Sequence, residues 1–226
     1  MWGEAHGSER KNKSRFCELK VKTHVDVLCV GHACYDLVFA VDHHPGADEK
    51  TFAEKLISCG GGPAANAAVT VSRLGLKSAF AGYLGNDFFG QRHLEELNQA
   101  AVNTDLIVCG DSPTPLSAIL IKPDGKRTVV NHKGDKAPLP ADSFELARWH
   151  SQVILFDGHE PEVSLALMKA IKDRGISTVL DAGSVHRGSL KLLDQVDYAV
   201  VSQKFARECT GKEDPQLFPH DPPSRQ

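Results

Sequence analysis

Apolar residues along the chain fall into two kinds of run, which predict two kinds of strand. The run VDVLCVG at 25–31 is continuous, β-branched and closed by glycine, which predicts a strand buried on both faces. The stretch 37–58 alternates partly around a Pro/Gly turn, and the stretch 116–133 does so around Pro-Asp-Gly. Each of these two stretches is predicted to form a half-exposed hairpin.

Helical patterns separate these strands and fill the second half of the chain. Residues 63–74 are Ala-rich, begin with proline and precede Gly75, which predicts a helix. A strand at 79–84 and a helix at 89–101 are predicted next. From residue 153 onward apolar strands alternate with helical runs, which is typical of the α/β class with a parallel sheet flanked by helices.

The two ends of the chain differ from this pattern. Residues 1–24 are polar and of mixed charge, and residues 214–226 contain four prolines without periodicity. Both segments are predicted to be disordered, as a leader and a tail. The α/β domain is therefore expected to span 25–213.

Composition and charge exclude several classes of protein. The 226 residues are 41% hydrophobic, which suffices for one sizeable core, and the net charge of −3 shows no basic stripe for nucleic acid. No run of 18 apolar residues predicts a membrane helix. Six cysteines without a CxxC pair favour a reducing compartment, and the leader lacks the apolar core of a signal peptide. We therefore expect a cytoplasmic protein.

The first candidate for chemistry is a glycine cluster between a predicted strand and a predicted helix. Gly60, Gly61 and Gly62 precede the helix, and Asn66 lies in its first turn. Backbone N–H groups and an amide side chain would converge there, and glycine would let a ligand approach closely. The alternative is a tight turn packed by small residues.

A longer pattern around this cluster resembles a known family. The string GGPAANAAVTVSRLGLKSAFAGYLG at 61–85 is similar to the first signature of the ribokinase-like (PfkB) carbohydrate kinases. The resemblance covers about 25–211, and GGGPAA with AAV and RLG is most similar to the sulfofructose kinase-like branch. It implies an α/β sandwich with a small β-lid formed by the two hairpins.

The resemblance also implies a sugar site. Asp36 in GHACYD matches the family's aspartate that accepts hydrogen bonds from sugar hydroxyls, although an isolated aspartate would more often cap a turn. Gly61, Gly62 and Asn66 are carried over as further hydroxyl contacts. A sugar or sugar derivative is thus the expected ligand.

Two other places have polar residues of interest. Lys126 and Arg127 follow the second hairpin's turn, where the family often has a basic residue near the lid; a charged turn is the alternative. Asp157 and His159 follow a strand end, where open α/β sheets place ligand-binding loops, so either could face the sugar.

Two further sets of polar residues lie at a strand end and in a turn. Asp181 also ends a strand and is a secondary candidate that could equally cap a helix. The adjacent His43 and His44, with Asp42, are read as a solvated turn because neighbouring residues of a strand point to opposite faces. No metal ligand is predicted.

Groups for phosphoryl transfer are not visible in the sequence. This reaction needs a positioned base and an anion site or metal clamp, which the family supplies from a later DTxGAGD segment. That string is absent from 202–226, SQKF stands at the NxxE element at 202–205, and no GxxxxGK[ST] loop occurs. We therefore expect no catalytic residue here, and ATP and Mg²⁺ are expected for the family rather than for this chain.

Three expectations follow from reading the chain as C-terminally truncated. The C-terminal part of the fold should be missing, an apolar sheet edge should be open to water, and stability should be marginal. The alternative is a non-catalytic interaction protein that pairs through exposed lid strands, and two copies joined through the lid are also expected. A dinucleotide-binding enzyme is disfavoured because VGHACYD lacks the GxGxxG turn.

Overall fold

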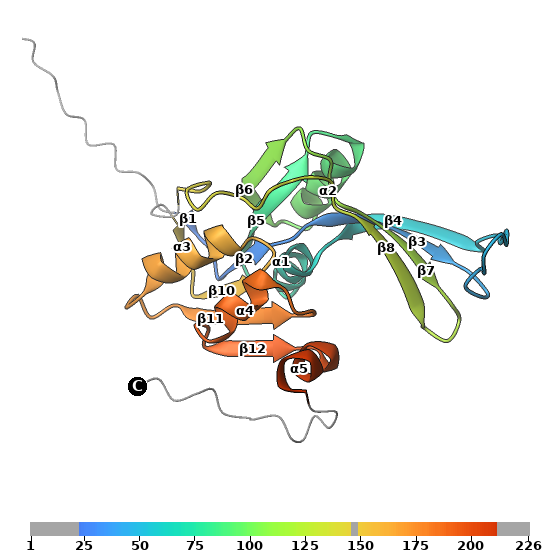
Figure 1. The fold of residues 1–226 in the computed structure, drawn as a ribbon. Helices are drawn as coiled ribbons and strands as arrows, with labels where there is room; N and C mark the ends of the chain where they lie inside the picture. Colours follow the sequence, from blue (N-terminus) through green and yellow to red (C-terminus); the bar gives the residue numbers. More distant parts are fainter. Residues whose placement is uncertain (1–22, 146–148, 212–226) are drawn as a thin grey trace, which may run out of the picture.

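The computed structural model describes residues 23–145 and 149–211. In these residues a central sheet of six parallel strands has the order β12-β11-β10-β2-β5-β6 (Figure 1). Its strands are β2 (Val27–Gly31), β5 (Ser78–Gly85), β6 (Asn103–Gly110), β10 (Val153–Phe156), β11 (Ser177–Ala182) and β12 (Tyr198–Val201). The predicted α/β class with a parallel sheet is confirmed.

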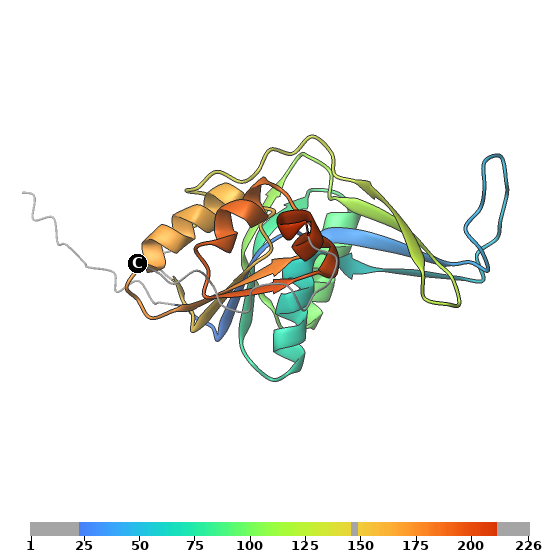
Figure 2. The ribbon, with the colours of Figure 1, turned by 60° about the horizontal axis from the view of Figure 1, so that its bottom comes forward.

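Helices cover both faces of this sheet (Figure 2). They are α1 (Pro63–Arg73), α2 (Phe88–Gln99), α3 (Pro161–Ile171), α4 (Arg187–Leu193) and α5 (Gln203–Thr210). Leu167 of α3 and Leu192 of α4 pack in one apolar cluster, whereas Ala68 of α1 and Leu97 of α2 pack in another. The central strands therefore bury both of their faces, as their continuous apolar sequence predicts.

A second sheet of four strands projects from one end of the first, and we call it the lid (Figure 1). Its strands are β3 (Cys34–Ala40), β4 (Lys55–Gly61), β7 (Leu116–Ile121) and β8 (Arg127–His132), in the order β4-β3-β7-β8. β3 with β4 and β7 with β8 form antiparallel pairs in the stretches where hairpins were predicted. Parallel pairing of β3 with β7 joins them into one sheet.

The first lid pair extends further toward the central sheet than its sequence pattern suggested. Cys34 pairs with Gly61 and Tyr35 with Gly60, so the ladder continues to the start of α1. Gly60 and Gly61 are thus strand residues, and only Gly62 separates β4 from α1. The prediction that all three glycines lie between the strand and the helix was wrong for Gly60 and Gly61, because glycine can also pair in a strand where its neighbours leave no room for a side chain.

Parts of the predicted ends and edges also differ. Thr23 and His24, placed in the disordered leader by sequence, form β1 and pair with β9 (Trp149–His150). The rest of the leader and the predicted tail at 214–226 lie outside the described residues. β6 was not predicted, because its first residues are polar.

At the other edge of the sheet, the side chains of β12 are exposed, including Tyr198 and Val200. An apolar edge open to water is therefore present in the described part of the chain, and marginal stability stays a prediction. None of the helices in 23–145 and 149–211 is long and apolar enough to cross a membrane.

Candidate functional site

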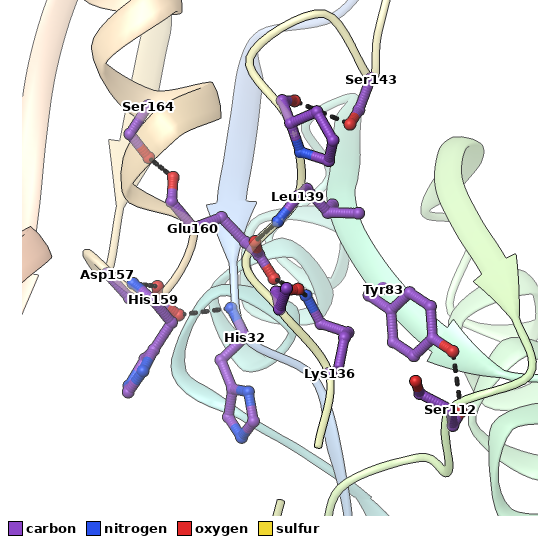
Figure 3. A network of polar contacts seen from close by, with 12 residues as sticks. His32, Tyr83, Ser112, Lys136, Leu139, Ser143, Asp157, His159, Glu160 and Ser164 are labelled. Carbon is purple, nitrogen blue, oxygen red and sulfur yellow. Dashed lines mark hydrogen bonds and ion pairs between the residues drawn. The ribbon is translucent and has the colours of Figure 1, made fainter. Parts of the chain in front are cut away.

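The carboxyl ends of the central strands meet the start of α1 around one buried carboxylate, that of Asp157. It follows β10 directly and is 2% exposed. Its oxygens accept hydrogen bonds from the backbone N–H groups of His32 at 2.7 Å, His159 at 2.9 Å and Ala64 at 3.2 Å. The bonds to His32 and His159 are drawn in Figure 3. A single side chain thus ties the ends of β2 and β10 to the first turn of α1.

This placement corrects the prediction that Asp157 faces the sugar. Its carboxylate points inward, where three backbone donors need an acceptor. A Cβ at Gly31 would overlap this carboxylate, so glycine is required there. Burial raises the pKa of Asp157 to about 6, against the opposing effect of the amide hydrogen bonds. Asp157 therefore builds the site rather than contacting a ligand.

Asp36 lies on β3 at the root of the lid and is half-buried. Its carboxylate accepts a hydrogen bond from the Cys34 thiol at 3.2 Å and lies against Gly61, where a Cβ would overlap Oδ2. Gly62 follows with φ of 100°, and a Cβ there would overlap the His32 carbonyl oxygen. The structure thus brings Asp36, Gly61 and Gly62 together at the start of α1, as the sequence suggested.

Asn66 lies one turn into α1 and is exposed. It lines a groove of about 710 Å³ between α1 and α2, together with Cys59, Gly60 and Arg73. Cys59 is the strand partner of Asp36. Asn66 therefore lies near the root of the lid, where it lines the groove together with the strand partner of Asp36.

Two α2 residues support the lid from behind, and sequence reasoning missed both. Glu96 accepts hydrogen bonds from the Gly60 N–H at 2.6 Å and the Tyr35 hydroxyl at 3.3 Å. His93 packs on Gly60 and is 2% exposed; among the described residues its Nδ1 has no hydrogen-bond partner. Burial lowers the pKa of His93 to about 4. The i, i+3 spacing of the two on a predicted helix was the available signal.

Three histidines follow the ends of three strands that adjoin in the sheet, and we call them the histidine row: His32 after β2, His159 after β10 and His186 after β11. The ring centroids of His32 and His159 are 4.9 Å apart, and those of His159 and His186, which stack, are 4.6 Å apart. Only His159 was predicted. The signal for the others was their position just beyond predicted parallel strands.

The three histidines of the row have lowered pKa values, and burial is the main cause. It lowers the pKa of His32 to about 3 and that of His159 to about 4, and it also lowers the pKa of His186. Lys133 lowers all three further through its charge. The imidazoles are consequently neutral at pH 7. The Nδ1 of His186 accepts a hydrogen bond from the Ser189 N–H at 3.3 Å, so its proton is on Nε2.

The connection from the lid back to the core, residues 133–145, crosses the end of the central sheet, and we call it the strap. Glu160, 4% exposed, accepts hydrogen bonds from Lys136 Nζ at 2.8 Å and from the Leu139 N–H at 2.6 Å (Figure 3). The Lys136 ammonium also lies 5.0 Å from the centre of the Tyr83 ring. These contacts fix the strap next to the ends of β5 and β10.

Arg127 is not brought to this site. It pairs with Ile121 in the lid, whereas Asp36 pairs with Ser117 of the same strand β7. Four residues of strand separate the two positions by about 13 Å, which places Arg127 toward the far end of the lid. The neighbouring Lys126 forms an ion pair with Asp124 at 3.6 Å in the turn. A contact between Arg127 and a sugar, which the family's basic residue near the lid implied, stays a prediction.

The secondary candidates are also located. Asp181 is near the end of β11; burial raises its pKa and nearby His159 opposes this. On the lid, His43 Nδ1 contacts Asp42 at 2.6 Å. Asp181 therefore borders the histidine row, and His43 belongs to an exposed ion pair.

The residues at the position of the NxxE element have structural roles in the fold. Ser202 Oγ accepts a hydrogen bond from the Phe205 N–H at 3.0 Å and donates one to the Gly183 carbonyl at 2.8 Å, as the N-cap of α5. Phe205 is 1% exposed. In 23–145 and 149–211 no group of three or more His, Cys, Asp or Glu side chains could hold a metal ion.

The buried histidines predict that acid lowers stability. In the unfolded chain histidine has a pKa of about 6.5, whereas those of His32, His93 and His159 are about 3 to 4 in the fold. Between these values the unfolded chain binds more protons, so the free energy of unfolding falls as pH falls. Asp157 opposes this with one proton, because its pKa is raised by folding.

We expect the free energy of unfolding to be on the order of 2–3 kcal/mol smaller at pH 5.5 than at pH 7. Urea unfolding at both pH values measures this. His93→Gln removes one of the three titrating groups and should reduce the pH dependence by about a third. Equal free energies at the two pH values would contradict the assignment of neutral, buried histidines.

Known proteins similar to this chain share both its sequence pattern and its fold. A model described as pfkB family carbohydrate kinase matches residues 25–220. The ribokinase of Lactococcus lactis subsp. lactis is 27% identical over 198 residues, which are 86% of this chain and 63% of that protein.

Solved structures agree with this. The crystal structure of an Agrobacterium tumefaciens protein described as a ribokinase has a TM-score of 0.74 at 26% identity, covering 86% of this chain and 64% of that one. Arabidopsis thaliana ribokinase complexed with ribose and ATP has a TM-score of 0.70 at 23% identity, covering 84% of this chain and 64% of that one. The chain thus spans less than two thirds of the length of each of these proteins.

Proposed function

The chain belongs to the pfkB family of carbohydrate kinases, and from this membership we propose that it binds a sugar between Asp36 and the start of α1. The observation that carries the proposal is the carboxylate of Asp36 held against Gly61 next to Gly62. A fixed carboxylate accepts hydrogen bonds from hydroxyl groups, and glycines leave the backbone open to a close ligand. These are the requirements for recognising a polyhydroxylated ring.

Other residues would complete the pocket. His159, at the end of β10, and Asn66, at the root of the lid, are proposed as further partners of the sugar hydroxyls. The lid would cover the ligand and exclude water. The particular sugar is open, and membership of the sulfofructose kinase-like branch stays a prediction.

Isothermal titration of the full chain with a panel of free sugars tests the proposal. Saturable binding of at least one sugar is expected, and ATP is added in a second series to ask whether it changes the affinity. A folded chain that binds none of the sugars would overturn the assignment.

Phosphoryl transfer to the bound sugar is the activity that family membership suggests for the whole protein. We propose that it needs groups other than those in 23–145 and 149–211, because Ser202 is occupied as a helix cap and Phe205 is buried. Without added groups, this chain is expected to bind sugar and not to phosphorylate it. A cytoplasmic location is proposed as well; the five cysteines among the described residues are free thiols, which suits a reducing compartment.

We further propose that two copies associate through the lid. Its outer strands expose apolar side chains, with Leu56 57% exposed on β4 and Val130 66% exposed on β8. Exposed apolar strands at a sheet edge favour pairing with another chain. The alternative, a different protein as partner, would use the same surface.

Val130→Glu should therefore shift the chain toward the monomer, because a charge would be buried in the interface. Size-exclusion chromatography with light scattering over a concentration series measures this. Leu74→Glu is the matched control, since Leu74 is 75% exposed but follows α1, away from the lid. A wild-type chain that is monomeric at every concentration would rule out self-association and leave the different partner as the alternative.

A further inference from the structure

A cavity of about 220 Å³ lies at the amino ends of the central strands, where α3 ends. The strands run toward the lid, so this cavity is at the opposite end of the sheet from the lid and the start of α1 (Figure 1). We propose that it binds a small carboxylic acid with an apolar body, such as an arylacetate. The proposal does not depend on the sugar site.

The walls of this cavity are mostly apolar. Leu28 of β2, Ile154 of β10 and Leu167 of α3 line it, and all three are buried. Trp149 of β9 and Ile176, just before β11, are further lining residues. All five belong to one apolar cluster or pack against it. Since an apolar cavity of about 150 Å³ can bind benzene, this one has room for an aromatic ring with a short side chain.

Two polar side chains, those of Arg174 and Ser151, line the cavity as well. Within residues 23–145 and 149–211 the exposed guanidinium group of Arg174 forms no ion pair, and the hydroxyl of Ser151, which is 4% exposed, forms no hydrogen bond. A buried hydroxyl without a partner is unfavourable, because it has lost its hydrogen bonds to water. A guanidinium group matches the two oxygens of a carboxylate. Both groups therefore favour an anionic ligand that accepts hydrogen bonds.

A tight turn after α3 fixes the backbone of Arg174 at the cavity. Its N–H donates a hydrogen bond to the Ile171 carbonyl oxygen at 2.9 Å. Asp173 and Gly175, on either side, both have φ of 67°, which is left-handed backbone and reverses the chain before β11. Lys172 and Asp173 are exposed neighbours of opposite charge that do not line the cavity. Arg174 is therefore the cation that a ligand in the cavity would meet.

Size, polarity and charge together select the class of ligand. Apolar walls disfavour a sugar, whose hydroxyl groups would lose their hydrogen bonds to water. The guanidinium group repels a metal cation. The volume is below that of typical sites for drug-sized ligands, so the ligand should be small. A short aromatic acid meets all of these conditions, because its ring fills the apolar space and its carboxylate accepts hydrogen bonds from the polar side chains.

The fluorescence of Trp149 tests the proposal in the full chain. The sequence has two tryptophans, so Trp2→Phe leaves Trp149 as the only one, and a ligand in the cavity should change its emission. Phenylacetate is compared with phenylacetamide, which has the same ring and no charge. We expect a saturable change, with phenylacetate binding about 10-fold tighter than the amide. Phenylacetate should also raise the urea midpoint of unfolding, because it binds the folded chain.

Two variants, made in the Trp2→Phe chain, connect the effect to the cavity. Arg174→Gln should weaken phenylacetate binding about 10-fold, to the level of the amide, and leave the amide unaffected. Ala170→Leu fills part of the cavity from an exposed position of α3 and should weaken both ligands several-fold, and leucine is a good helix former. Lys172→Gln removes a neighbouring cation that does not line the cavity, so this control should leave both affinities unchanged.

Each outcome supports or overturns this site without reference to sugar binding. A folded chain in which neither the emission nor the urea midpoint responds to phenylacetate would overturn it. Equal affinities for the acid and the amide, or a preference that Lys172→Gln reduces as much as Arg174→Gln does, would also overturn it. A preference that only Arg174→Gln removes, with both ligands weakened by Ala170→Leu, supports the site. A failure of the sugar titrations would leave these results unchanged.

Discussion

Asp157→Ala is expected to lower the free energy of unfolding by about 3–5 kcal/mol, because the N–H groups of His32, Ala64 and His159 lose their acceptor. Each buried donor without a partner costs about 1–3 kcal/mol, and some of the three would find water in the space left behind. Typical domains have only about 5–15 kcal/mol in total, so the variant should be close to unfolding. Urea unfolding followed by circular dichroism measures the loss.

Two further variants make this result interpretable. Asp157→Asn keeps one carbonyl acceptor but turns an NH₂ group toward a backbone donor, so its loss should be smaller than that of alanine. Asp105→Ala removes an exposed carboxylate from β6 and should change stability by less than about 0.5 kcal/mol. If Asp157→Ala were within about 1 kcal/mol of wild type, the carboxylate would not be what holds β2, β10 and α1 together.

Asp36→Ala is expected to weaken sugar binding by about 100-fold or more. A hydrogen bond to a charged group contributes about 1.5–3 kcal/mol, and two hydroxyl contacts would together account for at least 3 kcal/mol. The fold should tolerate the change, since Asp36 is half-buried and the hydrogen bond it loses is a weak one from the Cys34 thiol. Calorimetric titration with the best sugar of the panel measures the affinity.

Asp36→Asn separates charge from shape at this position. It fits against Gly61 and keeps one acceptor, so a loss of about 10-fold is expected. Asp124→Ala, in the exposed turn of the lid, removes an aspartate away from the pocket and should leave the affinity unchanged. An unaltered dissociation constant in a folded Asp36→Ala variant would remove Asp36 from the sugar site.

Much of the fold follows from periodicity in the sequence. Continuous apolar runs in β2, β10 and β11 alternate with helical runs, and a parallel sheet flanked by helices is the arrangement that buries both. Strand ends were harder to predict. Gly60 and Gly61 resemble a loop because glycine has no side-chain pattern, and their pairing with Tyr35 and Cys34 depends on residues 25 and 27 positions away.

In the candidate site, too, some features could be predicted from the sequence and others could not. The neighbourhood of Asp36, Gly61 and Gly62 was expected from a motif with fixed spacing. Asp157 was misread because the sequence shows which side chain follows a strand but not which backbone donors surround it. The histidine row was missed as a unit because His32 and His186 are 154 positions apart, and only the order of strands in the sheet brings them near His159.

The contact between each site aspartate and a glycine bears on how substrate range can change in evolution. A Cβ at Gly61 would overlap Asp36, and a Cβ at Gly31 would overlap Asp157, so neither glycine can gain a side chain while its aspartate stays in place. A new preference that required a change in either pair would need two simultaneous substitutions. Selection, in nature or in a mutant library, should therefore reach new sugars by single steps at the rim, through positions such as Lys133 and His159, while the two pairs persist.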